Sequence, residues 1–300
     1  MTIRPKRFGT ESTILYAAVL AMALSVPAYS LDIEAGAFFG NLGLPWAGES
    51  PMAEAVYPAN LWLYGGRAAF AEDLGDGFSL VAEYETDTVL RNIVRGIVTY
   101  ETGIASISAG PMVGAFNSVA SPLKAGINIG FKLEAPGIAF FSAKAESSMG
   151  AGLAAAGDYS QELSELSAGW YVYNAICSVS MITKRYTRIV STGDPLVDGS
   201  TNYLFSVDVH QKGAPYRVFA ELGYRSMTRT YSDSTADGLG AVVLGATVSA
   251  ILNPRLTLVA GLDSGVYVFG TGLLAGRSPA ATSFIFQASL GCVIKLIDVE

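Results

Sequence analysis

The residues best suited to chemistry in this chain are Ser206, Asp208 and His210, which stand at alternate positions and include the only histidine. A hydrolase needs its histidine within hydrogen-bond reach of a serine nucleophile and of an orienting acid. On a strand these three residues share one face, and Ser206 and His210 would be roughly 13 Å apart at ~3.4 Å per residue. That distance rules out direct proton transfer. We therefore expect no catalytic residue and no enzyme.

Metal and nucleotide sites have equally little support. A zinc site needs more nitrogen or sulfur ligands than His210, Cys177 and Cys292 supply. The acidic turns DSTADG (233–238) and GDPLVDG (193–199) lack the spacing of an EF-hand loop. No glycine-rich loop ends in the Lys-Ser/Thr of a phosphate cradle. We expect no metal and no cofactor, and we interpret the two cysteines as small apolar residues rather than as a disulfide.

The remaining polar side chains recur at every second position of apolar stretches. In SPLKAGINIGFKLEAPGIAFFSAKAE (121–146), apolar residues such as Ile127 and Phe131 alternate with Lys124, Asn128 and Lys132. Successive side chains of a strand point to opposite faces, so a period of two indicates strands. The stretch predicts an antiparallel hairpin, turning at APG, with one apolar and one polar face.

The same alternation, read along the whole chain, predicts an all-β fold of about 14 strands, within a range of 12–16. The expected strands are 31–43, 59–72, 77–87, 91–101, 104–116, 122–134, 137–147, 160–173, 175–188, 201–212, 215–229, 238–252, 255–269 and 281–296. Short turns such as TG, APG and KGAP alternate with longer connections such as STGDPLVDGS and MTRTYSDSTADG. An even strand number with this alternation is typical of up-and-down membrane barrels.

Composition favours a membrane protein that spans with strands. The chain has 300 residues, of which 51% are hydrophobic and only 15% charged. After the N-terminal region no run of ~18 apolar residues could form a spanning helix. Nearly every expected strand has an apolar face, and no segment remains to cover all of these faces in water. We therefore expect the apolar faces to meet lipid and the charged faces to line the interior of a closed barrel.

The N-terminus has the features of a secretory signal peptide. Arg4, Lys6 and Arg7 precede an apolar core over 14–26, and small residues near Ser30 make cleavage before Leu31 plausible. We expect residues 1–30 to be the signal peptide and 31–300 to be the barrel. Cleavage would remove a net charge of +2 and change the net charge of the chain from −7 to −9. Such acidity argues against nucleic acid as a partner.

The signal peptide, the turn pattern and strands such as FIFQASLGCVIKL (284–296) make the chain resemble the outer-membrane β-barrel proteins of bacteria with two membranes. The resemblance implies an outer-membrane location, contact with membrane lipid and insertion by the barrel assembly machinery. Members of this family usually end their last strand in an aromatic residue, whereas this chain ends in KLIDVE. That departure suggests a divergent lineage, for example of spirochaete type.

The lead hypothesis is an outer-membrane pore for passive diffusion of small polar solutes. Alternatives are a non-conducting structural or adhesin-type barrel and a transporter of apolar molecules, which the apolar connections GLAAAG and GTGLLAG would suit. The oligomeric state is left open. With near balance of basic and acidic residues on the inner face, and Asp198, Asp233 and Asp237 in acidic outer connections, we expect a mild cation preference. The expected pore-lining residues are Arg67, Glu83, Arg95, Asn128, Lys132, Lys144, Asp208, His210, Arg217, Glu221, Arg225, Asp263 and Gln287.

Overall fold

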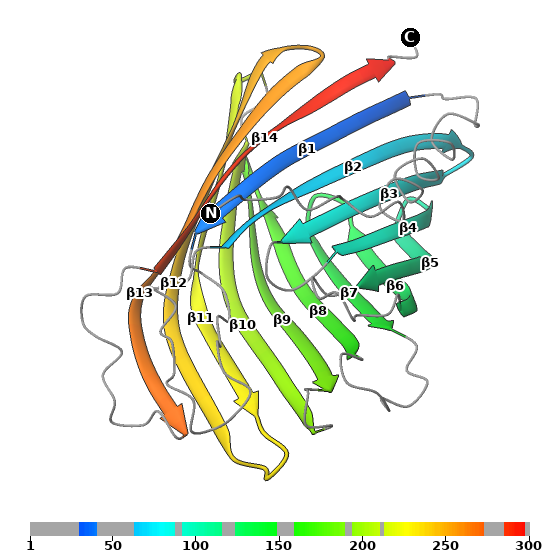
Figure 1. Ribbon diagram of the computed structural model, residues 1–300. Helices are drawn as coiled ribbons and strands as arrows, with labels where there is room; N and C mark the ends of the chain where they lie inside the picture. The colour runs from blue at the N-terminus through cyan, green and yellow to red at the C-terminus, as the bar shows by residue number, and fades with distance from the viewer. Residues whose placement is uncertain are drawn as a thin grey trace, which may run out of the picture.

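The chain folds into a closed antiparallel β-barrel of fourteen strands in a computed structural model (Figure 1). The structure describes residues 30–40, 63–87, 92–115, 124–148, 159–189, 194–210, 213–272 and 285–297. The strands are β1 (Ser30–Gly40), β2 (Leu63–Gly75), β3 (Phe78–Asp87), β4 (Asn92–Glu101), β5 (Ala105–Ala115), β6 (Lys124–Ala135), β7 (Ala139–Ser148), β8 (Tyr159–Val172), β9 (Ala175–Ile189), β10 (Pro195–His210), β11 (Tyr216–Thr230), β12 (Ala236–Asn253), β13 (Leu256–Gly272) and β14 (Ile285–Ile297). The predicted fold class and strand number are confirmed.

Each strand pairs with its neighbours in the chain, and β1 closes the barrel against β14 with Ala35 opposite Cys292. The described part of the chain holds no helix long and apolar enough to span a bilayer. Closure leaves no strand edge, so each described strand has a hydrogen-bonding neighbour on both sides. Several short turns depend on glycine in the left-handed region, including Gly75, Gly137 and Gly213 with φ of +80°, +73° and +82°. Residues 1–29 of the predicted signal peptide lie outside the described ranges, and its predicted last residue, Ser30, begins β1.

The outward face of the barrel is apolar and exposed. Ile127, Ile129, Leu133 and Leu290 are 46%, 53%, 46% and 67% exposed. In water such a surface would be costly, because burying apolar area contributes about 25 cal/mol per Å². A bilayer removes this cost, so the exposed apolar band fits a position in lipid. Cys177 and Cys292 are both free, as expected.

The strands are unequal in length, and the longer ones change character toward the long connections. The strands β9–β13 have 15 to 18 residues, whereas β1–β7 have 10 to 13. Figure 1 shows β11 and β12 reaching beyond their neighbours at the lower end of the barrel. Here Leu196, Met227 and Tyr231 are buried, while the outward residues Thr187 and Thr228 are polar. The outward face thus turns polar and the inner face gains apolar residues beside its charges, as expected where a strand leaves lipid for water.

This change of face pattern explains why the start of one strand was predicted wrongly. The sequence predicted that β10 begins at 201, whereas it begins at Pro195. Asp198 and Asp237, predicted to lie in outer connections, are consequently strand residues in β10 and β12. The alternation with apolar residues outward, on which the prediction rested, does not hold for this end of the strand.

The face assignment predicts opposite outcomes for an arginine at two adjacent positions of β14. Leu290 faces outward near the middle of the strand, whereas Ser289 faces inward, where its Oγ lies 2.6 Å from an ideal Cβ position at Gly261. Leu290→Arg should cost about 2–4 kcal/mol of barrel stability, because the guanidinium would sit in hydrocarbon. Ser289→Arg should cost much less. Urea unfolding of both variants in lipid vesicles measures the difference, and equal losses would contradict the assignment.

The alternation of connections predicts which rim faces the cell exterior. The β11–β12 connection contains Ser234 in the left-handed region, while the β6–β7 turn contains Gly137. An epitope tag inserted between Asp233 and Ser234 should bind antibody on intact cells. The same tag inserted after Pro136 should stay inaccessible until the cells are lysed. The reverse labelling pattern would show that the short turns, and not the long connections, face the cell exterior.

Candidate functional site

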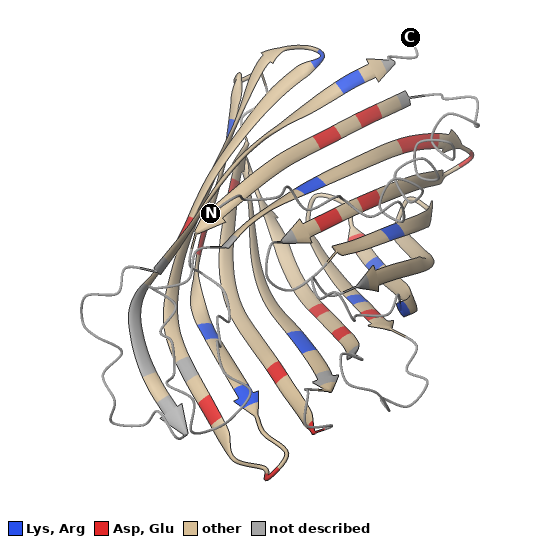
Figure 2. Ribbon diagram, in the orientation of Figure 1, with Lys and Arg blue, Asp and Glu red and all other residues tan. Residues whose placement is uncertain are grey.

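Figure 2 shows ionisable residues spread over most strands of the barrel. The strand registers and ion pairs put most of the described ones on the inner face. The strand registers place every residue predicted to line a pore on the face opposite the exposed apolar side chains. Representative pairs are Glu83 opposite Arg95, and Asp263 opposite Gln287. These charges alternate with outward apolar residues, so the polar face and the apolar face are two sides of the same strands.

Arg95 on β4 is the centre of the largest polar cluster. Its Nε donates to Glu146 on β7, its Nη2 donates to the same carboxylate at 3.3 Å, and its Nη1 donates to Glu85 on β3 at 3.1 Å. Glu83 lies 3.7 Å from Nη1. The side-chain amide of Gln161 on β8 also donates to Glu146. The Arg95–Glu146 pair bridges over β5 and β6, which requires a concave face.

Asn128 lies beside this cluster. Its register partner is Glu146, and its amide donates to the carbonyl of Pro111 at 3.3 Å. Arg95, Asn128, Glu146 and Gln161 are 8%, 8%, 6% and 1% exposed, so the group is nearly dry. Ionised side chains this deeply buried need partners, and the carboxylates around Arg95 supply them.

A second buried group lies near the long connections of β10–β12. The Nε and Nη2 of Arg229 donate to the two oxygens of Asp198 at 2.6 and 3.0 Å. The hydroxyl of Tyr231 donates to Asp237 at 2.7 Å. Burial, together with this hydrogen bond, raises the pKa of Tyr231 to about 12, so the phenol keeps its proton at neutral pH. The charge of Asp198 is therefore balanced by Arg229, whereas Asp237 accepts from a neutral phenol and keeps its negative charge.

A third group forms where β11, β12 and β13 meet. A Cβ on Gly245 would lie 2.5 Å from an oxygen of Asp263 and 2.6 Å from Cγ of Glu221. These two carboxylates therefore lie over the glycine from opposite sides. Arg225 lies four residues from Glu221 on the same face of β11, and it donates to Asn202 on β10 at 2.7 Å. The absent side chain at Gly245 makes room for this convergence of charges.

Toward the short turns the pairs are more open. Arg217 donates to Asp208 through Nε at 2.6 Å, and His210 is the register partner of Arg217. Side chains of Arg67, Lys144 and Arg217 are 53%, 62% and 57% exposed. Lys132 pairs with Glu134 beside the β6–β7 turn. Two further pairs lie nearer mid-strand and join Arg67 to Glu34 at 2.6 Å and Lys144 to Glu165 at 3.9 Å.

Exposure of the inner charges differs from pair to pair. Near the long connections, Arg229 and Asp198 are only 2% and 7% exposed. Near the short turns, Arg217 is 57% exposed, whereas its partner Asp208 is 14% exposed. Buried ion pairs therefore alternate with more open ones along the barrel interior.

Hydrolytic and metal chemistry find no support in the described ranges. The hydroxyl of Ser206 lies 2.7 Å from that of Ser178, its hydrogen-bond partner. Within the described ranges, no group of three or more His, Cys, Asp or Glu is arranged to hold a metal ion. Within GDPLVDG, Asp198 is held by Arg229, and in DSTADG the hydroxyl and amide of Thr235 donate to Asp233. The Thr235 hydroxyl lowers the pKa of Asp233, which keeps this exposed carboxylate charged.

Comparison with known proteins gives a likeness in structure but none in sequence. No family model and no curated protein matches the chain. A solved structure described as the CymD monoaromatic hydrocarbon channel is 9% identical, with a TM-score of 0.50 over 98% of this chain and 95% of that one. The fold is that of bacterial outer-membrane channels. An outer-membrane location agrees with this fold and with the exposed apolar band.

Two further structures share the barrel more loosely. An outer-membrane channel from Pseudomonas putida F1 is 9% identical, with a TM-score of 0.49 over 91% of this chain and 97% of that one. The NanC porin is 12% identical, with a TM-score of 0.43 over 89% of this chain and 100% of that one.

Several inner residues were missing from the predicted set. Gln161, Asn202 and Arg229 are buried and hold Glu146, Arg225 and Asp198 respectively. Their parity within the strands could have found Gln161 and Arg229, which share the faces of Glu165 and Arg225. Asn202 is the second residue of its predicted strand, in phase with Ser206. The alternation does not show which partner each side chain selects.

The buried pair of Asp198 and Arg229 predicts a large and asymmetric mutational effect. Arg229→Met should cost about 3–5 kcal/mol, because it leaves the Asp198 carboxylate buried without its partner. Adding Asp198→Leu should restore much of this loss. Arg217→Met, at a half-exposed pair, should cost only about 1 kcal/mol or less. Urea unfolding of the barrel in vesicles tests the order, and additive losses in the Asp198/Arg229 double variant would contradict it.

Proposed function

We propose that this chain forms an outer-membrane channel for passive diffusion of small polar solutes. The observation that carries the proposal is the inner face, where paired charges, some buried and some half exposed, run the length of the barrel. A polar lining lowers the cost of moving a hydrated solute through the bilayer. A barrel of about this size lies between filled eight-stranded barrels and sixteen-stranded porins with a water channel. The buried ion pairs would therefore set the size limit.

The cluster around Arg95 also suggests a charge preference. Three carboxylates, Glu83, Glu85 and Glu146, lie within 4 Å of a single guanidinium. A local excess of negative charge in a low-dielectric passage favours cations. This cluster adds a second source to the cation preference predicted from the outer connections, where Asp198 is balanced by Arg229 but Asp233 is exposed and charged.

The hydrocarbon channel among the structural neighbours makes transport of apolar molecules the second candidate. An apolar solute would have to pass the buried ion pairs of Arg95 and Arg229, which offer it no favourable contact. The apolar connections that favoured this alternative span 152–157 and 270–276. The first lies outside the described residues, as does most of the second.

Single-channel recording of the barrel in planar bilayers tests the proposal. We expect steady open steps with a mild cation preference, measured as a reversal potential in a KCl gradient. The preference should fade at high salt, where the Debye length falls to about 3 Å at 1 M. Silent bilayers would instead favour the non-conducting barrel, and uptake of apolar but not polar solutes by vesicles would favour the second candidate.

Charge variants locate the preference. Replacing Glu83 and Glu85 together by Gln should reduce the cation preference, because both carboxylates lie within 4 Å of Arg95. Glu34→Gln is the matched control, since this carboxylate pairs with Arg67 outside the Arg95 cluster and is 43% exposed. An equal effect of the control would place the selective region elsewhere.

A further inference from the structure

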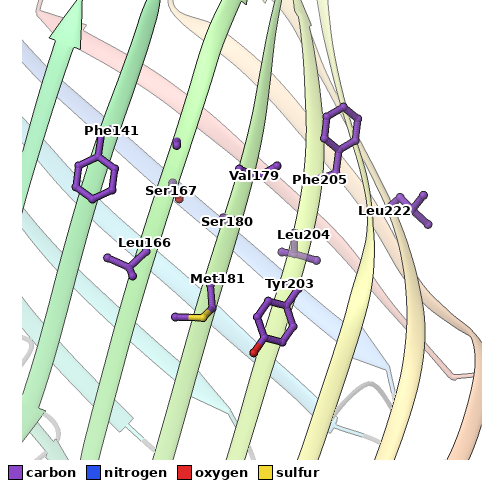
Figure 3. Close-up of a pocket in the computed structure, with 11 residues that line it drawn as sticks. Phe141, Leu166, Ser167, Val179, Ser180, Met181, Tyr203, Leu204, Phe205 and Leu222 are labelled. Atoms are coloured by element: carbon purple, nitrogen blue, oxygen red, sulfur yellow. The ribbon is translucent and has the colours of Figure 1, made fainter.

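The outer wall of the barrel carries a groove over β7–β11, on the side that faces lipid. Its volume is about 520 Å³, and its lining includes Phe141, Leu166, Met181, Tyr203, Phe205 and Leu222. Figure 3 shows these side chains projecting from adjacent strands along one stretch of wall. Tyr203 and Leu222 are 53% and 50% exposed, so the groove is open and apolar.

The registers explain why the wall is indented here. One transverse row of outward residues runs Phe141, Ala168, Val179, Phe205 and Leu222 across the five strands. Ala168 is the small member of this row, between a phenylalanine and a valine. The methyl group of Ala168 between these two larger side chains leaves a hollow in the wall.

Toward the long connections the outward rows change in chemistry. The row after the groove runs Ala145, Ser164, Thr183, Thr201 and Ser226, and so carries hydroxyls on four strands. The hydroxyls of Thr183 and Thr201 lie 3.5 Å apart.

The next row runs Ser147, Glu162, Arg185, Gly199 and Thr228. Arg185 follows Met181 by four residues, roughly 13 Å along the strand at ~3.4 Å per residue. Hydrocarbon, hydroxyl and charge thus follow one another along a single track.

Arg185 is available to a ligand on this track. Its Nη1 lies 3.9 Å from Glu162, at the limit of an ion pair, and the two side chains are 56% and 58% exposed. Such a pair contributes little in itself. Gly199 places no side chain beside Arg185 in the row, which leaves the guanidinium open on that side. A planar guanidinium can hold a phosphate through two parallel hydrogen bonds.

We propose that the wall formed by β7–β11 binds one anionic phospholipid of the leaflet nearest the long connections. An acyl chain lies in the groove, the polar linkage meets the hydroxyl row, and the phosphate contacts Arg185. A lipid suits this track better than a second copy of the chain, because a flexible chain can fill an irregular hollow while its head reaches a charge. The inference concerns the outer wall and does not depend on conduction through the interior.

Native mass spectrometry of the full barrel in a neutral detergent tests the proposal. The probes are phosphatidylglycerol and phosphatidylcholine with the same acyl chains. We expect the first phosphatidylglycerol to bind about fivefold more tightly, the factor expected from the roughly 1 kcal/mol attraction of one arginine to anionic lipid. Arg185→Gln should abolish the difference. Arg255→Gln, which removes an arginine from the opposite rim, should leave it unchanged.

A second variant separates the groove from the charge. Met181→Trp fills the hollow and should weaken binding of both lipids, whereas Leu258→Trp, on the outward face of β13, should not. Equal affinity for the two lipids, or a preference that survives Arg185→Gln, would overturn the headgroup contact. Binding unaffected by Met181→Trp would overturn the groove. A dimeric mass that Met181→Trp converts to a monomer would show that a second copy occupies the wall instead.

Discussion

The backbone hydrogen-bonding requirement of a chain in hydrocarbon is the constraint on which the rest of this structure depends. An unpaired amide or carbonyl costs several kcal/mol in lipid, so a sheet can cross a bilayer only if it closes. Here β1 pairs with β14 along most of its length, and every described strand gains two neighbours. Closure then assigns opposite solvents to the two faces of each strand. The period-two pattern follows from that assignment.

Closure also creates the problem that the inner charges solve. A narrow interior excludes much of the water that would hydrate an isolated ion, and lone charges there would be costly. The chain answers with pairs that join strands far apart in sequence, such as Arg95 with Glu146, 51 positions away. Where several charges converge, a glycine such as Gly245 supplies the space. Polar residues that would destabilise an ordinary core therefore stabilise this one and keep it hydrophilic.

Much of this fold could be predicted from the sequence, because each residue's face depends only on its parity within a strand. The hairpin over 121–146 is an example, since alternation alone gave its two faces and its turn. The position of a residue within a strand does not identify the side chain with which it pairs across the interior. Nothing in the alternation distinguishes the carboxylate that Arg95 selects from those it passes, since the choice depends on barrel curvature and on which side chains between them are small. The start of β10 was predicted wrongly for another reason: beyond the lipid the outward side chains are no longer apolar, so the alternation ends and Asp198 was assigned to a loop.

The outward residues of the barrel wall change in chemistry with their depth in the bilayer. Along β8–β10 the outward residues change from Leu166, Met181 and Tyr203 to hydroxyls and then to Glu162 and Arg185. A charge at mid-bilayer costs about 2–4 kcal/mol and almost nothing near the interface, so the first charged row marks the level of the headgroups. The same level, carried inward, falls near Asp198 and Arg229, where the interior is driest. The outer boundary of the lipid and the buried Asp198–Arg229 pair thus lie at similar heights. The extension of β10–β12 beyond this level builds, in water, the apolar inner packing of Leu196 and Tyr231 that supports the mouth of the barrel.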